Sequence, residues 1–406
     1  MSHPDNDKVG ASGLEKEGRG LSRGDVLRRG AALSIGGVFA ARGLPALAAS
    51  GRTEQEQFGA AEGGTLRWLS WPGHNDKSFI GPFEKRYGVK VQGKEYSGGD
   101  AMLALAANSK PGTFDVVHSD AEYIAQLRQA GLLIPLDPAE FPETKQFWPE
   151  YSVEGTKTKF PGLWSGGKPY GFPMRFGLLS LAFNTKYVKP EDATSYKVLW
   201  SDKVKGKVGW FDWWSHMGPV SLYVGNKNPY NLSSARFKKM TDAVNSLKPA
   251  TAGYYSIPQL FNVFANEEIY IQPAGGDWTA LLLQQQGHPI ATSVPKEGAI
   301  QWTECLGIFK GAKNPELAKE FIRYSLSAQG QVNTSILPAY QATIPSKAGW
   351  VLMNKEHPDV AKRLQMNLKG RNTLDLYRSG QVHIRQIPVQ QTIKQWNEAW
   401  TRFKNL

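Results

Sequence analysis

The stretch TLRWLSWPGHNDKSFIGPFEKRYGVKV, residues 65–91, carries the pattern that decides the fold. Residues 65–70 predict a buried strand. Apolar residues recur at helical spacing from Phe79 onward, which predicts a helix that ends at Gly88. Residues 89–91 predict the next strand. A strand, a helix of about ten residues and a second strand form a βαβ unit, which places its two strands in parallel.

The same alternation continues along the chain. Residues 100–109 and 121–130 predict helices, and the short apolar run 114–117 between them predicts a buried strand. A second α/β region extends over residues 186–295, and residues 300–309 predict a long strand. The sequence therefore predicts an α/β protein with mostly parallel sheets.

Further along, the tail is predicted to be mixed helical. Trp396, Trp400 and Phe403 recur at helical spacing, so we expect them to face the core of the protein.

The composition suits a soluble protein of two domains. The chain has 406 residues, of which 41% are hydrophobic and 21% charged. Its net charge is +12, but the basic residues are scattered among acidic ones and no nucleic-acid recognition motif is present. We therefore expect no nucleic-acid partner. The single cysteine, Cys305, cannot form an internal disulfide and is expected to be a small buried side chain.

Residues 1–48 have the three parts of an export signal. Arg28-Arg29 precedes an apolar run over residues 31–41, and small residues follow at a site that a signal peptidase could cleave. The arginine pair suggests the twin-arginine route, with the Sec route as the alternative. The alternative to an export signal is a helix that packs on the domain. A polar linker is predicted over residues 49–62. The expected location is the periplasm.

No catalytic motif occurs in the sequence. There is no HExxH, no P-loop, no GxGxxG after a strand and no GxSxG elbow. This favours ligand binding over catalysis, and we expect neither a catalytic residue, nor a cofactor, nor a metal. Adjacent tyrosines such as Tyr254-Tyr255 can ligate ferric iron, which leaves an iron-binding protein as a minor alternative.

Several local patterns together resemble one family. The mature chain resembles the bacterial spermidine/putrescine-binding proteins of ABC importers, over most of residues 64–345. The stretch with the sharpest likeness is VPKEGAIQW, residues 294–302. Supporting stretches are residues 69–71 (LSW), 114–119 (FDVVHS), 171–173 (GFP) and 183–185 (FNT).

The resemblance implies a two-lobed periplasmic-binding-protein fold of type II, whose α/β lobes are joined by crossing hinge strands near Leu178, Gly298 and Pro338. It also implies a monomer that delivers its ligand to an ABC permease in the inner membrane. The lobes would then comprise residues 63–178 with 298–338, and residues 179–297 with 339–406.

The family's binding residues map onto this chain through its motifs. Indole rings would stack on an apolar cation and carboxylates would bind its ammonium groups. Trp302 and Glu304 are two apart on a predicted strand, so both side chains can face one ligand. Asp277 is a further candidate for the binding site, because the glycines before it would let the backbone approach a ligand closely. The positions implied are Trp71, His74, Ser119, Asp212, Ser215, Trp302, Glu304, Tyr340 and Gln381.

Some of these positions depart from the family pattern. His74 replaces a frequent Tyr, Ser215 replaces a Glu that spermidine binders can have, and Arg175 adds positive charge near the expected cleft. Arg175 could meet a ligand carboxylate, or it could form a structural ion pair between the lobes.

The leading hypothesis is therefore a periplasmic receptor for a polyamine-like cation. The alternative is a receptor for an amino-acid-like zwitterion, an opine or a betaine. An exported enzyme using Asp212, Asp277 and Glu304 is a third hypothesis.

Overall fold

The computed structural model describes residues 64–406. The predicted export signal (1–48) and the predicted linker (49–62) lie outside the described residues. Within the described part of the chain, no helix has both the length and the apolar character needed to cross a bilayer.

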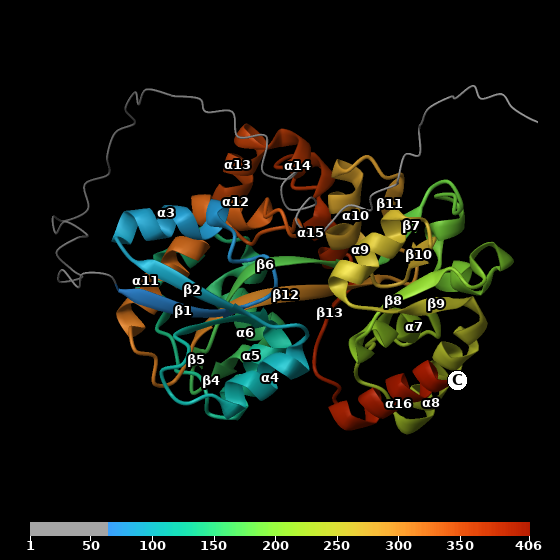
Figure 1. The fold of residues 1–406 in the computed structure, drawn as a ribbon, viewed down its shortest axis with the longest axis horizontal. Coiled ribbons are helices and arrows are strands. Elements are labelled where there is room, and N and C mark those ends of the chain that lie inside the picture. Colours follow the sequence, from blue (N-terminus) through green and yellow to red (C-terminus); the bar gives the residue numbers. More distant parts are fainter. Residues whose placement is uncertain (1–63) are drawn as a thin grey trace, which may run out of the picture. The chain divides into compact units, whose positions relative to one another are not determined.

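One large sheet grows from the βαβ unit predicted at residues 65–91 (Figure 1). Its strands run in the order β13-β12-β3-β1-β2, and β6 also pairs with β12. The β1–β2, β1–β3 and β12–β13 pairs are parallel, whereas β12 is antiparallel to β3 and β6. The strands are β1 (Thr65–Ser70), β2 (Lys90–Glu95), β3 (Val116–Asp120), β6 (Phe172–Leu179), β12 (Ala299–Ile308) and β13 (Val382–Ile384).

Three helices connect or follow the first strands of this sheet. The Asp76 carboxylate caps the first of them by accepting a hydrogen bond from the Ser78 N–H at 2.8 Å. The same helix ends at Gly88, whose φ of 61° suits a residue without a side chain. The helices are α3 (Lys77–Tyr87), α4 (Gly99–Asn108) and α5 (Ala121–Gln129).

A second large sheet has the strand order β11-β7-β10-β8-β9. Strand β8 is parallel to β9 and β10, and β7 is antiparallel to β10 and β11. Strands β4 (Trp164–Ser165) and β5 (Lys168–Pro169) form a separate hairpin. The strands of the second sheet are β7 (Leu181–Asn184), β8 (Val208–Phe211), β9 (Thr251–Tyr255), β10 (Ile271–Gln272) and β11 (Ile290–Ser293).

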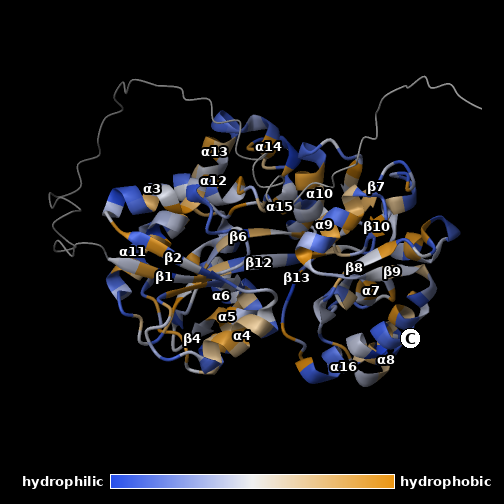
Figure 2. Ribbon diagram, viewed as in Figure 1, coloured by the Kyte–Doolittle hydropathy of each residue, from blue (hydrophilic) through white to orange (hydrophobic). Residues whose placement is uncertain are grey.

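The remaining helices pack around the two sheets. Blue and orange residues mix along most of them, as expected for helices with one face on a sheet and one in solvent (Figure 2). They are α6 (Val153–Lys159), α7 (Gly218–Tyr223), α8 (Ser234–Ser246), α9 (Ile257–Ala265), α10 (Gly276–Gln285), α11 (Pro315–Leu326), α12 (Ala328–Ser335), α13 (Lys347–Glu356), α14 (Pro358–Arg363), α15 (Thr373–Arg378) and α16 (Ile393–Asn405).

The chain passes between the two sheets at three places. It leaves the first sheet between β6 and β7, at Ser180, and returns between β11 and β12, over residues 294–298. These passages lie close to the expected crossings at Leu178 and Gly298. The expected crossing near Pro338 is not found there, because Thr343 pairs with Phe176 of β6 and keeps this part of the chain on the first sheet.

The third passage follows β13 instead. Strand β13 pairs with β12, whereas α16 packs on the second sheet. Trp396, Trp400 and Phe403 are buried, which confirms the prediction that they face the core. The rings of Trp400 and Phe403 lie 5.7 and 5.5 Å from the ring of Trp210 on β8.

Candidate ligand-binding cleft

A cavity lies where strand ends of the two sheets meet, and it contains about 390 Å³ of atom-free space, part of it open to solvent. The lining is dominated by aromatic and aliphatic side chains, with three charged ones among them. The lining residues are Trp71, Asp120, Leu179, Phe211, Trp213, His216, Ile257, Trp278, Trp302, Glu304, Tyr340 and Arg385.

One side of the cavity, here called the charged wall, comes from the first sheet and the segments attached to it. Trp302 and Glu304 lie two apart on β12, and both line the cavity. Trp71 follows β1 and Asp120 ends β3, so these side chains sit at carboxyl ends of parallel strands. The charged wall comprises Trp71, Asp120, Leu179, Trp302, Glu304, Tyr340 and Arg385.

The Glu304 carboxylate is surrounded by donors from its own wall. Its Oε1 accepts a hydrogen bond from the Tyr340 hydroxyl at 2.7 Å. Its Oε2 lies 2.9 Å from Arg175 Nε, 2.8 Å from His118 Nε2 and 3.5 Å from His74 Nε2. Burial alone would raise the pKa of Glu304, but the charge of Arg175 and the neighbouring His118 imidazole hold this pKa well below its usual range. Glu304 is therefore an ionised and already paired carboxylate.

Arg175 is fully buried behind this carboxylate. It lies opposite Glu304 on the neighbouring strand β6, and its Nη1 donates to the Thr334 carbonyl at 2.7 Å. Its guanidinium lies over the Tyr340 ring at 4.3 Å from the centroid. The structural ion pair expected as one role of Arg175 thus forms within the first sheet rather than between the lobes. Arg175 does not line the cavity, so it is not placed to receive a ligand carboxylate.

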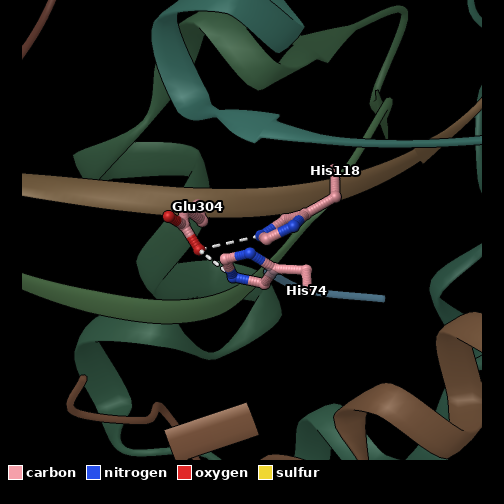
Figure 3. A group of neighbouring side chains, drawn as sticks. All are labelled: His74, His118 and Glu304. Carbon is pink, nitrogen blue, oxygen red and sulfur yellow. Dashed lines mark ion pairs between the residues drawn. The ribbon is translucent and has the colours of Figure 1, made fainter. Parts of the chain in front are cut away.

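His74, His118 and Glu304 are close enough to share a metal ion, since one ligand atom from each lies within 4.8 Å of the others (Figure 3). The arrangement has another explanation, because the Arg175 guanidinium occupies a position beside the same carboxylate oxygen. Burial first, and then the charge of Arg175, lowers the pKa of His74 to about 3, so this imidazole is neutral. The cluster fits a buried ion pair with two neutral histidines.

A second buried ion cluster lies at the other end of the charged wall. Arg385 follows β13, and its Nη2 lies 2.6 Å from Asp120 Oδ1, while its Nε donates to Glu122 Oε1. Burial raises the pKa of Asp120 and Glu122, and the positive charge of Arg385 opposes this rise. The guanidinium lies 4.5 Å from the centroid of the Trp213 ring. Arg385 therefore links both acids to the opposite side of the cavity.

The opposite side, here called the aromatic wall, comes from the end of β8 and from segments that follow strands of the second sheet. Trp213 Nε1 donates to the Tyr123 hydroxyl of α5 at 3.1 Å, which fixes the indole. Burial first, and then Arg385, lowers the pKa of His216 to about 3, so this imidazole is also neutral. The aromatic wall comprises Phe211, Trp213, His216, Ile257 and Trp278.

The Trp302 ring depends on a missing side chain on the neighbouring strand. Gly177 of β6 lies opposite Trp302 on β12. A Cβ atom at Gly177 would come within 2.5 Å of Trp302 Cζ2 and 2.9 Å of Asp277 Oδ1. Glycine is therefore required at this position for the indole to occupy its present place.

The structure brings some of the expected binding residues together and leaves others elsewhere. Trp71, Trp302, Glu304 and Tyr340 line the cavity. The other expected residues do not line it. Among these, His74 and Arg175 contact Glu304, Ser119 and Ser215 are buried, and Gln381 accepts a hydrogen bond from Ala299 through its backbone carbonyl.

Asp277 and Asp212 are both engaged by other parts of the protein. Asp277, at the start of α10, accepts hydrogen bonds from the N–H groups of Leu178 and Trp278 at 3.1 and 2.9 Å. Asp212 is exposed, and its Oδ1 accepts hydrogen bonds from Trp400 Nε1 at 2.7 Å and Lys404 Nζ at 2.9 Å. The expectation that Asp212 binds an ammonium group in the cleft is corrected, because this carboxylate ties the segment after β8 to α16.

The tyrosine pair considered for iron is also outside the cavity. The Tyr254 hydroxyl donates to the Phe403 carbonyl at 3.3 Å, and its ring packs on Trp400 with centroids 5.5 Å apart. Neither Tyr254 nor Tyr255 lines the cavity.

Sequence reasoning missed two of the charged residues of the cavity. Asp120 directly follows Ser119 at the end of a predicted strand, and that position was a usable signal. Arg385 had none, because its place depends on the pairing of β13 with β12. Trp213 and Trp278 stand beside predicted positions, and only their burial at the cavity distinguishes them from core residues.

Comparisons with known proteins agree with this architecture. The family of bacterial extracellular solute-binding proteins matches residues 78–363. The spermidine/putrescine-binding periplasmic protein 1 of Haemophilus influenzae is 24% identical over 278 residues, which cover 68% of this chain and 74% of the relative. The spermidine/putrescine-binding periplasmic protein of Escherichia coli is 25% identical over 272 residues, with 66% and 74% covered.

A solved structure gives the same result for the fold. The spermidine/putrescine ABC transporter substrate-binding protein PotD from Streptococcus pneumoniae superposes with a TM-score of 0.66 at 16% identity, covering 84% of this chain and 99% of that one. The predicted type II periplasmic-binding-protein fold is confirmed. Because the family match extends over well over half of its length, this chain belongs to the bacterial extracellular solute-binding proteins.

Proposed function

We propose that this protein is the periplasmic receptor of an ABC importer and that it captures a small organic ammonium compound of the polyamine class in the cavity. The observation that carries the proposal is a cavity lined by indole rings and carboxylates where the two β-sheets meet. Cations bind favourably to such rings and to carboxylates. The named relatives, which bind spermidine and putrescine, support the same class of ligand.

The mechanism is capture followed by closure of two lobes, without any bond being broken. We assign the first sheet with its attached segments, up to β13, to one lobe, and the second sheet with α16 to the other. The three passages between the sheets would then act as hinges. A permease in the inner membrane would recognise the closed form, and the N-terminal segment would direct export by the twin-arginine or Sec route. The protein would act as a monomer.

A zwitterion is the second candidate ligand. The specific observation in its favour is Arg385, a guanidinium that lines the cavity beside the carboxylate of Asp120. An amino-acid-like ligand, an opine or a betaine would place its ammonium against the rings and its carboxylate near Arg385.

Titration calorimetry tests the proposal with putrescine, spermidine and a panel of amino acids and betaines. We expect saturable binding of at least one ammonium compound. Asp120→Asn should weaken a cationic ligand by about tenfold or more, because a lost charged hydrogen bond costs roughly 1.5–3 kcal/mol. Asp212→Asn is the matched control and should change affinity by less than about threefold, because Asp212 bonds α16.

Two results would contradict the proposal. Equal losses in the two variants would show that the cavity is not the binding site. A protein that binds none of these compounds would remove the ammonium class altogether.

A further inference from the structure

We infer that Arg385 sets the length of the amine that this cleft accepts. Its guanidinium closes the passage from the cleft into a second cavity, and it occupies the place that the far ammonium group of a longer amine would need. The inference rests on the proposed function and deepens it, because it names short diamines, rather than long polyamines, as the preferred ligands of the same cleft. Chain length can be varied at constant ligand charge, so the two effects can be separated by experiment.

A second cavity lies beside α5 and contains about 610 Å³ of atom-free space, part of it open to solvent. Its walls come from α5, from residues 159–163 and from residues 384–387 at the end of β13 and after it. Apolar side chains form much of the lining, and Glu122 adds a carboxyl group. Such a lining suits an alkyl chain that ends in an ammonium group. The apolar side chains include Phe160, Leu163, Ile384 and Ile387.

Arg385 lies between this second cavity and the cleft. Of the residues that the structure describes, it alone lines both spaces. Each of its two acidic partners lines one of them, Asp120 the cleft and Glu122 the second cavity. Its Nη2 lies 2.6 Å from Asp120 Oδ1, and its Nε donates to Glu122 Oε1. The side chain therefore separates two spaces, each of which holds one of its acidic partners.

Further contacts hold Arg385 in this position. Its backbone N–H donates to the Gln301 carbonyl of β12 at 2.8 Å. Its guanidinium lies 4.5 Å from the centroid of the Trp213 ring, and the residue is only 4% exposed. An amine that continued from the cleft into the second cavity would have to displace the guanidinium from its acidic partners. Separating a buried ion pair in this way is costly.

The position of the guanidinium is also one that a ligand could use. Two carboxyl groups close to one cation form an arrangement that an ammonium group binds as well. Arg385 fills the place between Asp120 and Glu122 with a cation of the protein itself. Without this side chain the cleft and the second cavity would join, and both acids would be available to the far ammonium group of a long amine.

Lys159 is another cation that lines the second cavity, but it is placed differently. It is exposed, and its Nζ lies over the Tyr377 ring at 4.8 Å from the centroid. The structure shows no ion pair between Lys159 and Glu122. Lys159 therefore does not take the place of Arg385 between the two acids.

Three linear diamines of equal charge test the inference on the unaltered protein. They are 1,4-diaminobutane, 1,6-diaminohexane and 1,8-diaminooctane, and each carries two ammonium groups at pH 7. We expect calorimetry to give a Kd for 1,8-diaminooctane at least about tenfold higher than that for the tighter-binding of the two shorter diamines, because the long chain has to break a charged hydrogen bond of Arg385. Equal or tighter binding of 1,8-diaminooctane would overturn the inference and leave the proposed function standing. If none of the diamines binds, the polyamine class of the proposed function is overturned, and this inference with it.

Variants sharpen the result through the length ratio, which is the Kd for 1,8-diaminooctane divided by the Kd for 1,4-diaminobutane. Arg385→Ala joins the two cavities and should lower the length ratio by about tenfold or more. In the double variant Arg385→Ala/Glu122→Gln the ratio should rise again by about tenfold, because the far ammonium group loses its carboxylate. Arg378→Ala is the matched control, since Arg378 also pairs with an acid, Glu150 at 2.7 Å, but lines neither cavity.

The length ratio of Arg378→Ala should stay within about threefold of that of the unaltered protein. An unchanged ratio in a folded Arg385→Ala protein would overturn the inference. An equally low ratio in the single and double variants would also overturn it, because Glu122 would then not bind the far ammonium group. If Arg385→Ala does not fold, the diamine series on the unaltered protein decides alone.

Discussion

The two walls of the cleft are built from different chemistry. The charged wall holds the carboxyl and guanidinium groups that line the cavity, and each of them is already paired with a group of the opposite type. The aromatic wall offers rings, an aliphatic side chain and a neutral histidine. The difference suggests a division of work, in which the charged wall supplies polar groups for a ligand and the aromatic wall supplies contact area. Changing one wall at a time tests this division.

The largest effect is expected on the charged wall. Arg175→Gln leaves the Glu304 carboxylate buried without its cationic partner, which costs about 3–5 kcal/mol of unfolding free energy. Denaturant unfolding at pH 7 measures this loss. Arg236→Gln on the exposed surface of α8 is the control and should change stability by less than about 0.5 kcal/mol. A loss below about 1 kcal/mol for Arg175→Gln would show that the two walls differ less in their electrostatics than the contacts indicate.

A smaller effect is expected from the histidine of the aromatic wall. The pKa of His216 is about 3 in the folded protein and near its ordinary value of 6.5 when unfolded, so its neutral form is favoured by folding. Its contribution is present above pH 6.5 and is lost as the pH falls toward 3, which amounts to about 2 kcal/mol between pH 7 and pH 5. In His216→Gln the difference in unfolding free energy between these two pH values should shrink by that amount. An unchanged difference would mean that His216 takes up a proton while folded.

The smallest effect is expected from one ring of the aromatic wall. Trp278→Ala should weaken an ammonium ligand about two- to thirtyfold, because a cation–π contact contributes about 0.5–2 kcal/mol. Trp200→Ala is the matched control, since Trp200 stacks on Tyr223 and does not line the cavity. Calorimetry with the tightest-binding compound among the polyamines, amino acids and betaines compares the two. Equal weakening in both variants would show that loss of packing, rather than loss of a ligand contact, is being measured.

The charged wall was partly predictable from the sequence and the aromatic wall was not. Strand periodicity placed Trp302 and Glu304 on the same side of β12, and strand and helix patterns gave the α/β class. The partners of Glu304 could not be predicted in the same way, because Arg175 reaches it only through the antiparallel pairing of β6 with β12. Sequence spacing carries no information on which strands become neighbours.

At Asp212 the resemblance to the family gave a wrong prediction. Its motif position suggested a ligand contact, but a side chain at the end of β8 can turn toward the cavity or toward α16, and Trp400 and Lys404 provide donors on the second side. Arg385 enters the cavity from a segment for which the sequence offered no local signal. In both cases the position of the side chain depends on how the C-terminal part of the chain packs on the two sheets. Local sequence patterns do not show this packing.

Gly177 brings strand β6 into direct contact with a ring that lines the cavity. Because the indole of Trp302 rests directly against the bare backbone at this position, a displacement of the strand would be transmitted to the ring without any intervening side chain. A methyl group at this position would come within 2.5 Å of Trp302 Cζ2, so the indole would have to move. A movement of β6, the strand that leads from the first sheet to the second, would therefore also move a ring that lines the cavity.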